Sequence, residues 1–552
     1  MMSELLHGRH RFTAMVAGLF LALSLVGCEG DDGAPGRDGT DGTDGLDGAA
    51  GVSCWDLNEN GVGDLPDEDL NGDGAVNVTD CNALASGAYG AQQLHAGYFT
   101  ENAYEGTQSC LNCHGLIGED MLSKAHFKWE GTATGLTGFE GETHGKNDII
   151  NNFCIAVPSN EGRCTQCHAG YGYSDNTFAF NDARSVDCLV CHDQTGDYAK
   201  DLTTAGLPVP TVDLTAVARS VAENEGVPTI DNCIDCHAKA GGGDNVKHGD
   251  LAMALANTTR EFDVHMGTDG IDKDCTFCHT VKKTAPPEED LIDHGIGGMV
   301  YHSTDEGVMR TCVDCHGNAS TNHVGLTVES ITSSPEHSKL ACQVCHIPTF
   351  ARDTSTKVDW RWEDAGKDLP ANPDPATGRD TFAKKKGTFV WANNVRPTLL
   401  YYDGKWDKAL IGDNDNYATL GGVLAKPSAD YTTPGAMIYT FKKMTGNQPV
   451  DSGNDTILVP HLFGMKGGPN PFWAKFDWDL ALADGALYAG QTYTGAFDFR
   501  DTVMYLAVNH EVAPPEQAYG MNGACGDCHL GAGIDWAALG WSDDPVQGGT
   551  RP

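Results

Sequence analysis

The pentapeptide Cys110-Leu111-Asn112-Cys113-His114 recurs in seven further copies along this chain of 552 residues. Each copy has the form Cys-x-x-Cys-His, and chance would supply roughly 0.03 such pentapeptides at these cysteine and histidine frequencies. The copies therefore decide how the chain must fold, and we number them first to eighth. They are Cys110–His114, Cys164–His168, Cys188–His192, Cys233–His237, Cys275–His279, Cys312–His316, Cys342–His346 and Cys525–His529.

This spacing predicts covalently attached haem. Two thiols separated by two residues can form thioethers with the haem vinyl groups, and the adjacent imidazole is placed to bind the iron. Zinc ribbons and thioredoxin-like thiol pairs are the alternatives for such spacing, and eight copies favour haem over both. The predicted cofactors are eight c-type haems, attached by Cys110, Cys113, His114, Cys164, Cys167, His168, Cys188, Cys191, His192, Cys233, Cys236, His237, Cys275, Cys278, His279, Cys312, Cys315, His316, Cys342, Cys345, His346, Cys525, Cys528 and His529.

The haems are expected to supply much of the core, because the 68 glycines of the chain bring no side chains to it. The predicted fold class is mostly α with extensive irregular loops, a multihaem c-type cytochrome with small β elements in its haem-free segment. Seven motifs fall in a haem domain over residues 95–346, and residues 501–535 carry a helix and the eighth motif. A tail follows over residues 536–552.

The chain is strongly acidic, with 36 Lys and Arg against 77 Asp and Glu and a formal net charge of −41. Such a charge argues against nucleic acid or an anionic membrane surface as the main partner.

The N-terminus predicts export with a lipid anchor. Arg9 and Arg11 precede an apolar stretch that ends in Leu25-Val26-Gly27-Cys28, and small residues before a cysteine resemble a bacterial lipoprotein signal. Residues 1–28 are therefore the predicted signal, with lipid on Cys28; a transmembrane anchor is the alternative. Glu29 stands where some bacteria use an aspartate for inner-membrane retention, which favours the outer membrane, on its periplasmic or cell-surface face.

Two further segments precede the haem motifs. Residues 29–52 carry glycine at every third position, the period of a collagen triple helix, although low proline content favours a flexible acidic spacer. Residues 53–82 form a predicted calcium-type module with a disulfide between Cys54 and Cys81, and metal-free acidic loops are the alternative. The EF-hand-like spacing of its second loop predicts calcium ligands at Asp69, Asn71, Asp73 and Asp80.

Distal iron ligands must come from outside the motifs. An electron-carrying haem generally has both axial positions filled, whereas a catalytic haem needs one that can open. Eleven candidates for eight positions cannot separate eight bis-histidine haems from seven and an exception. The candidates are His95, His126, His144, His248, His265, His294, His302, His323, His337, His461 and His510.

Residues 347–500 contain no cysteine and one histidine, but many aromatic residues. We expect this segment to wrap and shield the haems, with Arg361 or Lys405 available to line a substrate channel. The alternation over Gly387–Trp406 predicts a strand pair turned at Asn393-Asn394. The segments Asp479–Leu487 and Phe497–Val508 read as helices.

Ordered strings over roughly residues 100–535 resemble the octahaem tetrathionate reductase family of c-type cytochromes. The most specific are Asn151-Asn152-Phe153-Cys154, Val246-Lys247-His248-Gly249-Asp250-Leu251, Asp263-Val264-His265-Met266 and Asn509-His510-Glu511-Val512-Ala513-Pro514. The resemblance implies closely packed haems, one of them catalytic with a distal lysine, and turnover of tetrathionate, nitrite or hydroxylamine. It also implies distal ligands at His126, His248, His265, His294, His323, His337 and His510, with His461 less secure.

By position, the resemblance places the catalytic haem on the second motif, with His168 and Lys146 as its axial residues. A neutral amine can cap iron, yet the high pKa of lysine makes it displaceable and positive beside anionic substrates. Lys128, Lys124 and His144 are the alternatives to Lys146. Cys154, outside every motif, is either a reactive thiol or a buried structural one.

Three functions follow as hypotheses. The first is a reductase of a small sulfur or nitrogen oxyanion, supplied with electrons by partner cytochromes or a quinol-linked donor. The second is a cell-surface conduit in which every haem is bis-ligated and no small molecule turns over. The third is an assembly protein organised by the collagen-like and calcium segments.

Overall fold

The computed structural model describes Val76 and residues 91–551, except 224–225, 284–291, 299–301, 304–307, 319–321, 325, 327–328, 336, 522–524 and 532. Every described residue belongs to one compact unit, Val52–Pro552. The predicted lipid site Cys28, the spacer, the Cys54–Cys81 disulfide and the calcium ligands Asp69, Asn71, Asp73 and Asp80 lie outside the described residues. Within the described part, no helix is both long and apolar enough to span a bilayer.

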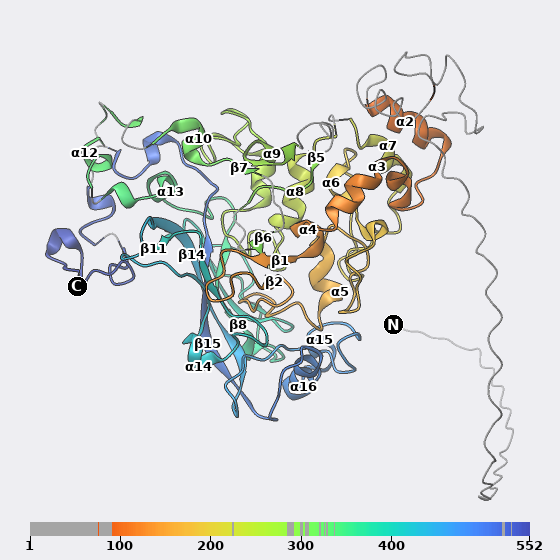
Figure 1. The fold of residues 1–552 in the computed structure, drawn as a ribbon. Coiled ribbons are helices and arrows are strands. Elements are labelled where there is room, and N and C mark those ends of the chain that lie inside the picture. Colours follow the sequence, from red (N-terminus) through yellow and green to blue (C-terminus); the bar gives the residue numbers. More distant parts are fainter. Residues whose placement is uncertain are drawn as a thin grey trace, which may run out of the picture. The chain divides into compact units, whose positions relative to one another are not determined.

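Each haem motif occupies about one helical turn, because side chains three residues apart then lie on the same face. Capping boxes start two of these turns: Thr229 with Asn232, and Thr311 with Asp314. The motifs lie on α3 (Gln108–Met121), α5 (Glu161–Cys164) with η1 (Thr165–Cys167), α6 (Leu189–His192), α8 (Ile230–His237), α9 (Cys275–Cys278), α10 (Cys312–His316), α13 (Cys342–His346) and η8 (Cys525–Asp527) (Figure 1).

Other short helices link and cover these turns. The N-terminal α2 (Ala91–Glu101) packs Phe99 against Val217 of α7 (Leu214–Ser220). The remaining helical elements are α4 (Ala125–Lys128), η2 (Ala183–Ser185), η3 (Met253–Asn257), α12 (Glu329–Thr332), η4 (His337–Lys339), η5 (Trp362–Asp364), α14 (Tyr417–Leu420), α15 (Phe472–Lys475), α16 (Trp478–Tyr488), η6 (Pro515–Gln517) and η9 (Pro545–Gln547).

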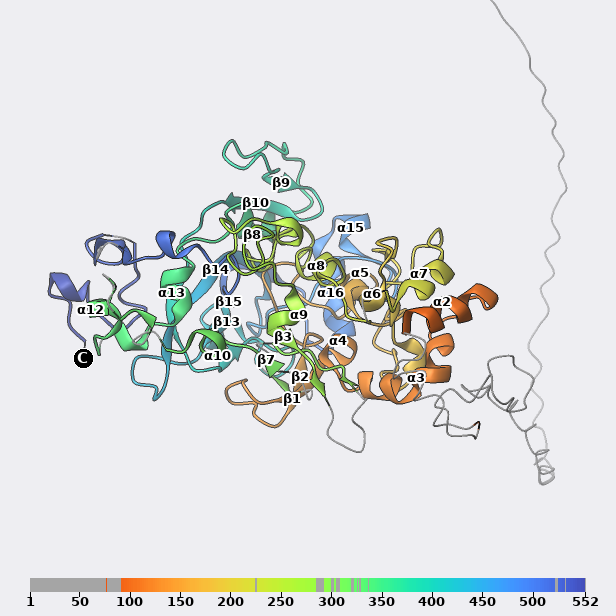
Figure 2. The same cartoon turned by 90° about the horizontal axis from the view of Figure 1, so that it is seen from above.

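The haem-free segment forms an eight-stranded mixed sheet, which is more β structure than the predicted small elements. Its order is β12-β13-β15-β14-β8-β10-β9, and β11 pairs with β14 (Figures 1 and 2). The strands are β8 (Thr356–Arg361), β9 (Phe382–Ala383), β10 (Gly387–Ala392), β11 (Thr398–Tyr402), β12 (Trp406–Lys408), β13 (Val423–Pro427), β14 (Met437–Asp451) and β15 (Phe497–Ala507).

Smaller sheets lie among the haem motifs. A three-stranded sheet has the order β2-β1-β6, and two ribbons pair β3 with β7 and β4 with β5. These strands are β1 (Glu130–Ala133), β2 (Thr143–Gly145), β3 (His279–Thr280), β4 (Lys282–Lys283), β5 (Ile292–Asp293), β6 (His302–Ser303) and β7 (Val308–Met309).

The prediction of a helix over Asp479–Leu487 is confirmed by α16, but the predicted helix over Phe497–Val508 is wrong. That segment is β15, which pairs antiparallel with β14 from Phe497↔Asp451 to Ala507↔Phe441. Its buried side chains alternate, at Thr502, Met504 and Leu506, so pairing within a long strand pair outweighed the helical interpretation.

The predicted hairpin at Asn393-Asn394 is also wrong, although both of its strands form. β10 pairs with β8 and β9, whereas β11 pairs with β14. Directly after the asparagines, Val395 exchanges two backbone hydrogen bonds of 2.9 Å with Phe350. This bridge carries the chain away from β10 before β11 begins.

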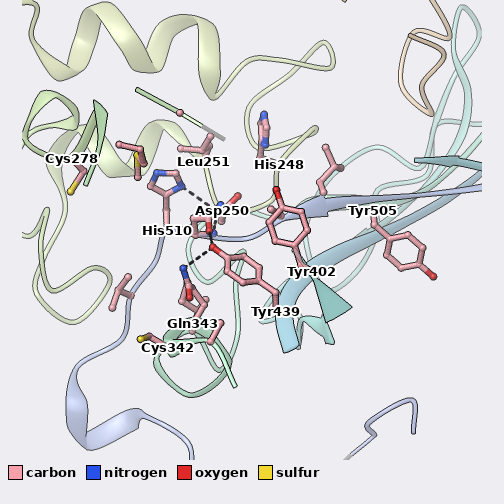
Figure 3. A pocket seen from close by; sticks show the side chains of 18 of the residues that line it. His248, Asp250, Leu251, Cys278, Cys342, Gln343, Tyr402, Tyr439, Tyr505 and His510 are labelled. Atoms are coloured by element: carbon pink, nitrogen blue, oxygen red, sulfur yellow. Dashed lines mark hydrogen bonds and ion pairs between the residues drawn. The ribbon is translucent and has the colours of Figure 1, made fainter. Parts of the chain in front are cut away.

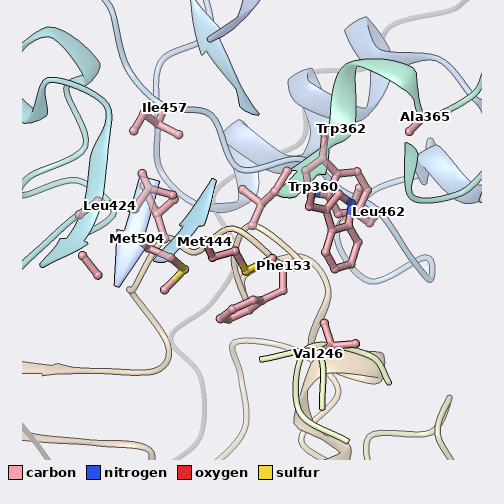
Figure 4. Close-up of a cluster of buried hydrophobic side chains, with 14 of the residues drawn as sticks. Phe153, Val246, Trp360, Trp362, Ala365, Leu424, Met444, Ile457, Leu462 and Met504 are labelled. Atoms are coloured by element: carbon pink, nitrogen blue, oxygen red, sulfur yellow. The ribbon is translucent and has the colours of Figure 1, made fainter. Parts of the chain in front are cut away.

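The main apolar core lies on this sheet and includes the string that leads into the second motif (Figure 4). Trp360 stacks on Trp362 with ring centres 5.2 Å apart, and Phe153 belongs to the same buried cluster. Asn152, fully buried, donates to the carbonyl of Met444 (2.9 Å) and accepts from Thr502 (2.6 Å). These contacts with the sheet fix the position of the chain segment that leads to Cys164.

Candidate haem sites and catalytic pocket

One continuous cavity of about 2650 Å³ lies among the haem motifs, and cysteines of the second to eighth motifs line it. Pockets for a single small ligand usually measure about 300–1,000 Å³. The cavity therefore has the volume for several large groups.

Seven motif histidines each face one histidine from elsewhere in the chain. Imidazole nitrogens bind metals at about 2 Å, so an iron between two imidazoles would separate the ring centres by about 6 Å. All seven observed separations fit that value. The pairs are His114–His95 (5.9 Å), His192–His294 (6.4 Å), His237–His126 (6.1 Å), His279–His510 (6.2 Å), His316–His265 (6.0 Å), His346–His323 (6.3 Å) and His529–His337 (6.4 Å).

The thiols show how the motifs follow one another in space. Neighbouring thiols join the first motif to the third, the second to the fourth, the fourth to the fifth and the sixth to the seventh. The contacting pairs are Cys110–Cys188, Cys167–Cys236, Cys233–Cys275 and Cys312–Cys342.

Weaker electrostatic interactions between cysteines connect the remaining motifs. Cys233 lies within range of Cys191, Cys278 within range of Cys315, and Cys345 within range of Cys528. The motifs therefore form a linear series, first, third, fourth, fifth, sixth, seventh and eighth. The second motif branches from this series at the fourth.

His168 of this branch motif is the exception among the motif histidines. Its ring is fully buried, its Nε2–H donates to the carbonyl oxygen of Phe127, and aromatic rings including Trp129 (5.5 Å) and Tyr173 (5.5 Å) surround it. Burial, and then the charge of Lys200, lower the pKa of His168 to about 3. Its motif thiols Cys164 and Cys167 line the cavity, but the imidazole does not.

Lys146 lines the cavity beside this motif. Its Nζ lies 4.7 Å from the centre of the Trp129 ring and within electrostatic range of Cys164 and Cys167. The Lys146 amide donates to the Trp129 carbonyl (2.7 Å), and a Cβ on the preceding Gly145 would come 2.0 Å from that same oxygen. Only glycine permits this close backbone approach, which fixes the backbone position of Lys146.

Three comparisons extend this geometry. A model of the bacterial cytochrome c family matches residues 357–532. An uncharacterized protein of Archaeoglobus fulgidus is 25% identical over an alignment that covers 32% of this chain and 73% of that protein. The crystal structure of an octahaem cytochrome c from Shewanella oneidensis is 37% identical, with a TM-score of 0.66, and covers 80% of this chain and 94% of its own.

This chain belongs to the octahaem tetrathionate reductase family. It is a multihaem c-type cytochrome that carries electrons, and the predicted resemblance is confirmed. The paired histidines and the cavity described above fit such haems.

Further cations of the octahaem cytochrome gather near Lys146. Lys247 and Lys408 also line the cavity. Burial and the charges of Lys146 and Lys408 lower the pKa of Lys247 to about 7, and burial lowers that of Lys408 to about 8. The backbone link from Ile149 to Leu410 brings the Lys146 segment to the end of β12, which carries Lys408. This cationic group stands out in a chain of net charge −41.

The other predicted ligands of the second motif lie elsewhere. Lys124 is buried in an ion pair with Asp120 (2.8 Å), and neither Lys124 nor Lys128 lines the cavity. His144 is hydrogen-bonded through Nδ1 to Asp148 (2.5 Å). Of the candidates for this position, Lys146 is the one in the cavity wall.

The structure also places three residues that the sequence singled out, His248, His461 and Cys154. His248 lines the cavity but belongs to none of the seven ring pairs (Figure 3), and burial with the Lys247 charge lowers its pKa. His461 is fully buried and hydrogen-bonded to Phe463 (3.1 Å). Cys154 lines the cavity, and burial raises its pKa, so its thiol is held protonated.

His95 was among the eleven candidate ligands but not among those that the resemblance implied, and two residues expected near a channel lie away from the cavity. His95 lies on α2, at the N-terminal edge of the described chain, and faces His114. Arg361 and Lys405, expected near a channel, are absent from the cavity lining and pair with carboxylates, Arg361 with Asp359 (3.1 Å) and Lys405 with Glu140 (3.8 Å).

Proposed function

We propose that this octahaem cytochrome passes electrons along seven bis-histidine haems to an eighth, attached at Cys164 and Cys167, where a small sulfur or nitrogen oxyanion is reduced. Tetrathionate, nitrite and hydroxylamine define the substrate class. The paired histidines would hold the seven, and Lys146 would hold the branch haem together with His168.

One observation carries this proposal: a single motif departs from the pattern of the other seven. Its histidine is held in an aromatic cage, and a lysine stands in the cavity wall beside its thiols. His168 remains a predicted ligand of the same haem, and binding would require its ring to turn from the Phe127 carbonyl. Because an amine ligand is displaceable, the position that Lys146 caps can open to substrate.

The chain itself supplies the electrostatics of this pocket. Lys247 and Lys408 attract an anionic substrate, and burial strengthens that attraction because the surrounding dielectric is low. His248, whose ring lies in the same cavity wall, provides a hydrogen-bonding group. A bound haem supplies the one-electron transfers and, at an open axial position, a binding place for substrate.

The proposal includes an exported location. Covalent haem attachment of this type takes place outside the cytoplasm, which agrees with the sequence of residues 1–28. We place the protein at the outer membrane, anchored through lipid on Cys28, with partner cytochromes or a quinol-linked donor as its electron source. Residues 53–82 would bind calcium and act as a spacer.

Spectroscopy of the purified holoprotein tests the enzyme function. Electron paramagnetic resonance and magnetic circular dichroism should resolve seven bis-histidine haems and one with a different ligand set, and nitrite or hydroxylamine should change the signal of that one alone. Eight centres that stay inert to both compounds would exclude small-molecule turnover.

The pH dependence of substrate affinity should show the contribution of the Lys408 charge. With a pKa of about 8, its ammonium is charged below that pH and neutral above it, so its attraction for nitrite is lost as the pH rises through about 8. Since a loss of about 1.4 kcal/mol equals tenfold in affinity, we expect Lys408→Met to raise the KM for nitrite about tenfold below that pH. The variant should also flatten the pH profile of KM.

Lys426→Met is the matched control for this experiment. Lys426 is 48% exposed on β13, pairs with Asp407 (3.6 Å) and does not line the cavity. An equal change in KM for both variants would show that overall charge, and not the pocket, is responsible.

A second function is favoured by the linear series of thiols. The first and sixth motifs are exposed, as is Cys525 of the eighth. A series with accessible motifs can carry electrons between two external partners without using the branch. This conduit predicts that seven haems reduce and reoxidise at full rate when the branch haem is absent.

A further inference from the structure

The C-terminal residues after the eighth motif are a packed structure and not a loose tail. Trp536 stacks on the His529 ring at 5.2 Å with an interplanar angle of 13°. Leu539 is buried in a cluster with Tyr401 and Ile438 of the sheet, and Arg551 donates to the Leu539 carbonyl (3.1 Å). The segment therefore holds the eighth motif against the sheet.

Asp544 lies at the centre of this segment and is 1% exposed. Its Oδ1 accepts a hydrogen bond from His529 Nδ1 at 2.7 Å and from the Val546 amide at 3.0 Å. Its Oδ2 accepts from the Leu530 amide at 2.8 Å and from Gln547 Nε2 at 3.2 Å. Four donors fix the carboxylate, and the carboxylate in turn fixes the imidazole.

This partner distinguishes His529 from the other motif histidines. His279 Nδ1 contacts a neutral acceptor, the backbone carbonyl of Gly297, at 2.7 Å. Among the motif histidines, all of which the structure describes, His529 is the one with a carboxylate within hydrogen-bond distance of its ring. At the opposite side of the eighth haem position stands His337, with ring centres 6.4 Å apart.

A carboxylate that accepts the Nδ1 proton makes the other ring nitrogen a more basic ligand. A more basic ligand, with a fixed negative charge behind it, favours the ferric state over the ferrous state. The reduction potential of the haem that His529 holds must therefore fall relative to the same haem without the carboxylate.

The fifth haem position has a comparable group on its facing side, where His510 Nδ1 lies 3.2 Å from the buried carboxylate of Asp250. We propose that Asp544 is a positioning residue that lowers the reduction potential of the eighth haem below that of its neighbour, the seventh, and makes the C-terminal end of the series the electron-entry end. This inference rests on the proposed haem ligation. A reduced one-electron donor loses one electron there, the ferric eighth haem gains it, and the electron then moves to the seventh haem and onward at higher potential. Asp544 acts only through His529.

Potentiometric titration of the holoprotein, followed by magnetic circular dichroism, tests the proposal without any substrate. Asp544→Asn keeps the shape but removes the charge, so one haem should shift to higher potential while the other seven stay in place. Asp543→Asn removes the same charge from the neighbouring exposed residue and should shift nothing. Asp544→Glu keeps the charge and should stay near the wild-type potential.

The proposal fails if Asp544→Asn leaves every potential unchanged or shifts several haems alike. It also fails if Asp544→Glu shifts the potential as far as Asp544→Asn does. Mass spectrometry confirms that each variant carries its full set of haems. Because these potentials are measured without nitrite, an inert branch haem would overturn the proposed function and leave the Asp544 result intact.

Discussion

Replacing Lys146 with leucine should lower the rate of nitrite or hydroxylamine reduction by about 100-fold, since losing one preorganised polar group at a reaction centre commonly costs that much. Leucine has no nitrogen to bind iron and no positive charge. One haem of eight should therefore change its ligand-field spectrum, and the electron-carrying haems should keep theirs. Magnetic circular dichroism and steady-state rates measure the two effects on one sample.

Lys128→Leu is the matched control, because Lys128 lies nearby in the chain but outside the cavity lining. It should retain both the wild-type spectrum and the wild-type rate. If Lys146→Leu leaves all eight spectra untouched, Lys146 is not a ligand, and His168 or another group must bind the branch haem. A changed spectrum with an unchanged rate would place turnover at a different haem.

The haem motifs could be predicted from sequence because their chemistry is local. Two thiols three residues apart and a following histidine define an attachment site within one turn of helix, whatever surrounds it. The resemblance to the family also predicted which motif is the exception and named most of the histidines that face the other motifs. His126, His265, His294, His323, His337 and His510 all face motif histidines as the resemblance implied.

The pairing of His95 with His114, the strand β15 and the contact of Asp544 with His529 all depend on distant residues. His95 faces His114 because α2 packs on α7, a contact between segments more than a hundred residues apart. β15 was read as a helix because its strand partner, β14, is separated from it in the chain by α15 and α16. Asp544 carries no local signature, and only folding brings it to His529.

The branched order of the motifs is also invisible in the sequence, where the second motif lies between the first and the third. In space, the first motif contacts the third and the second contacts the fourth. The proposed catalysis at the second motif would therefore lie off the direct path of electrons, so that the series could fill with electrons while one reaction proceeds at the side.

Deleting the branch by Cys164→Ala with Cys167→Ala should separate the two proposed functions. The variant should lose oxyanion reduction entirely, because the proposed substrate site is gone. The remaining seven haems should still be reduced by reduced methyl viologen in one fast phase, because none of their thiol contacts passes through Cys164 or Cys167 except the side contact to Cys236. Mass spectrometry should show the loss of one haem.

Cys233→Ala with Cys236→Ala is the matched variant at the junction, and it also removes one haem. Cys233 contacts Cys275 and neighbours Cys191, so this deletion interrupts the series between the third and fifth motifs and detaches the branch. Since electron transfer slows steeply when an intermediate centre is missing, reduction should split into a fast and a slow phase, and oxyanion turnover should fall as well. Single-phase reduction in this variant would show that the series does not pass through the fourth motif. Persistent turnover in the branch variant would show that the reaction takes place on another haem, and only the conduit function would then remain.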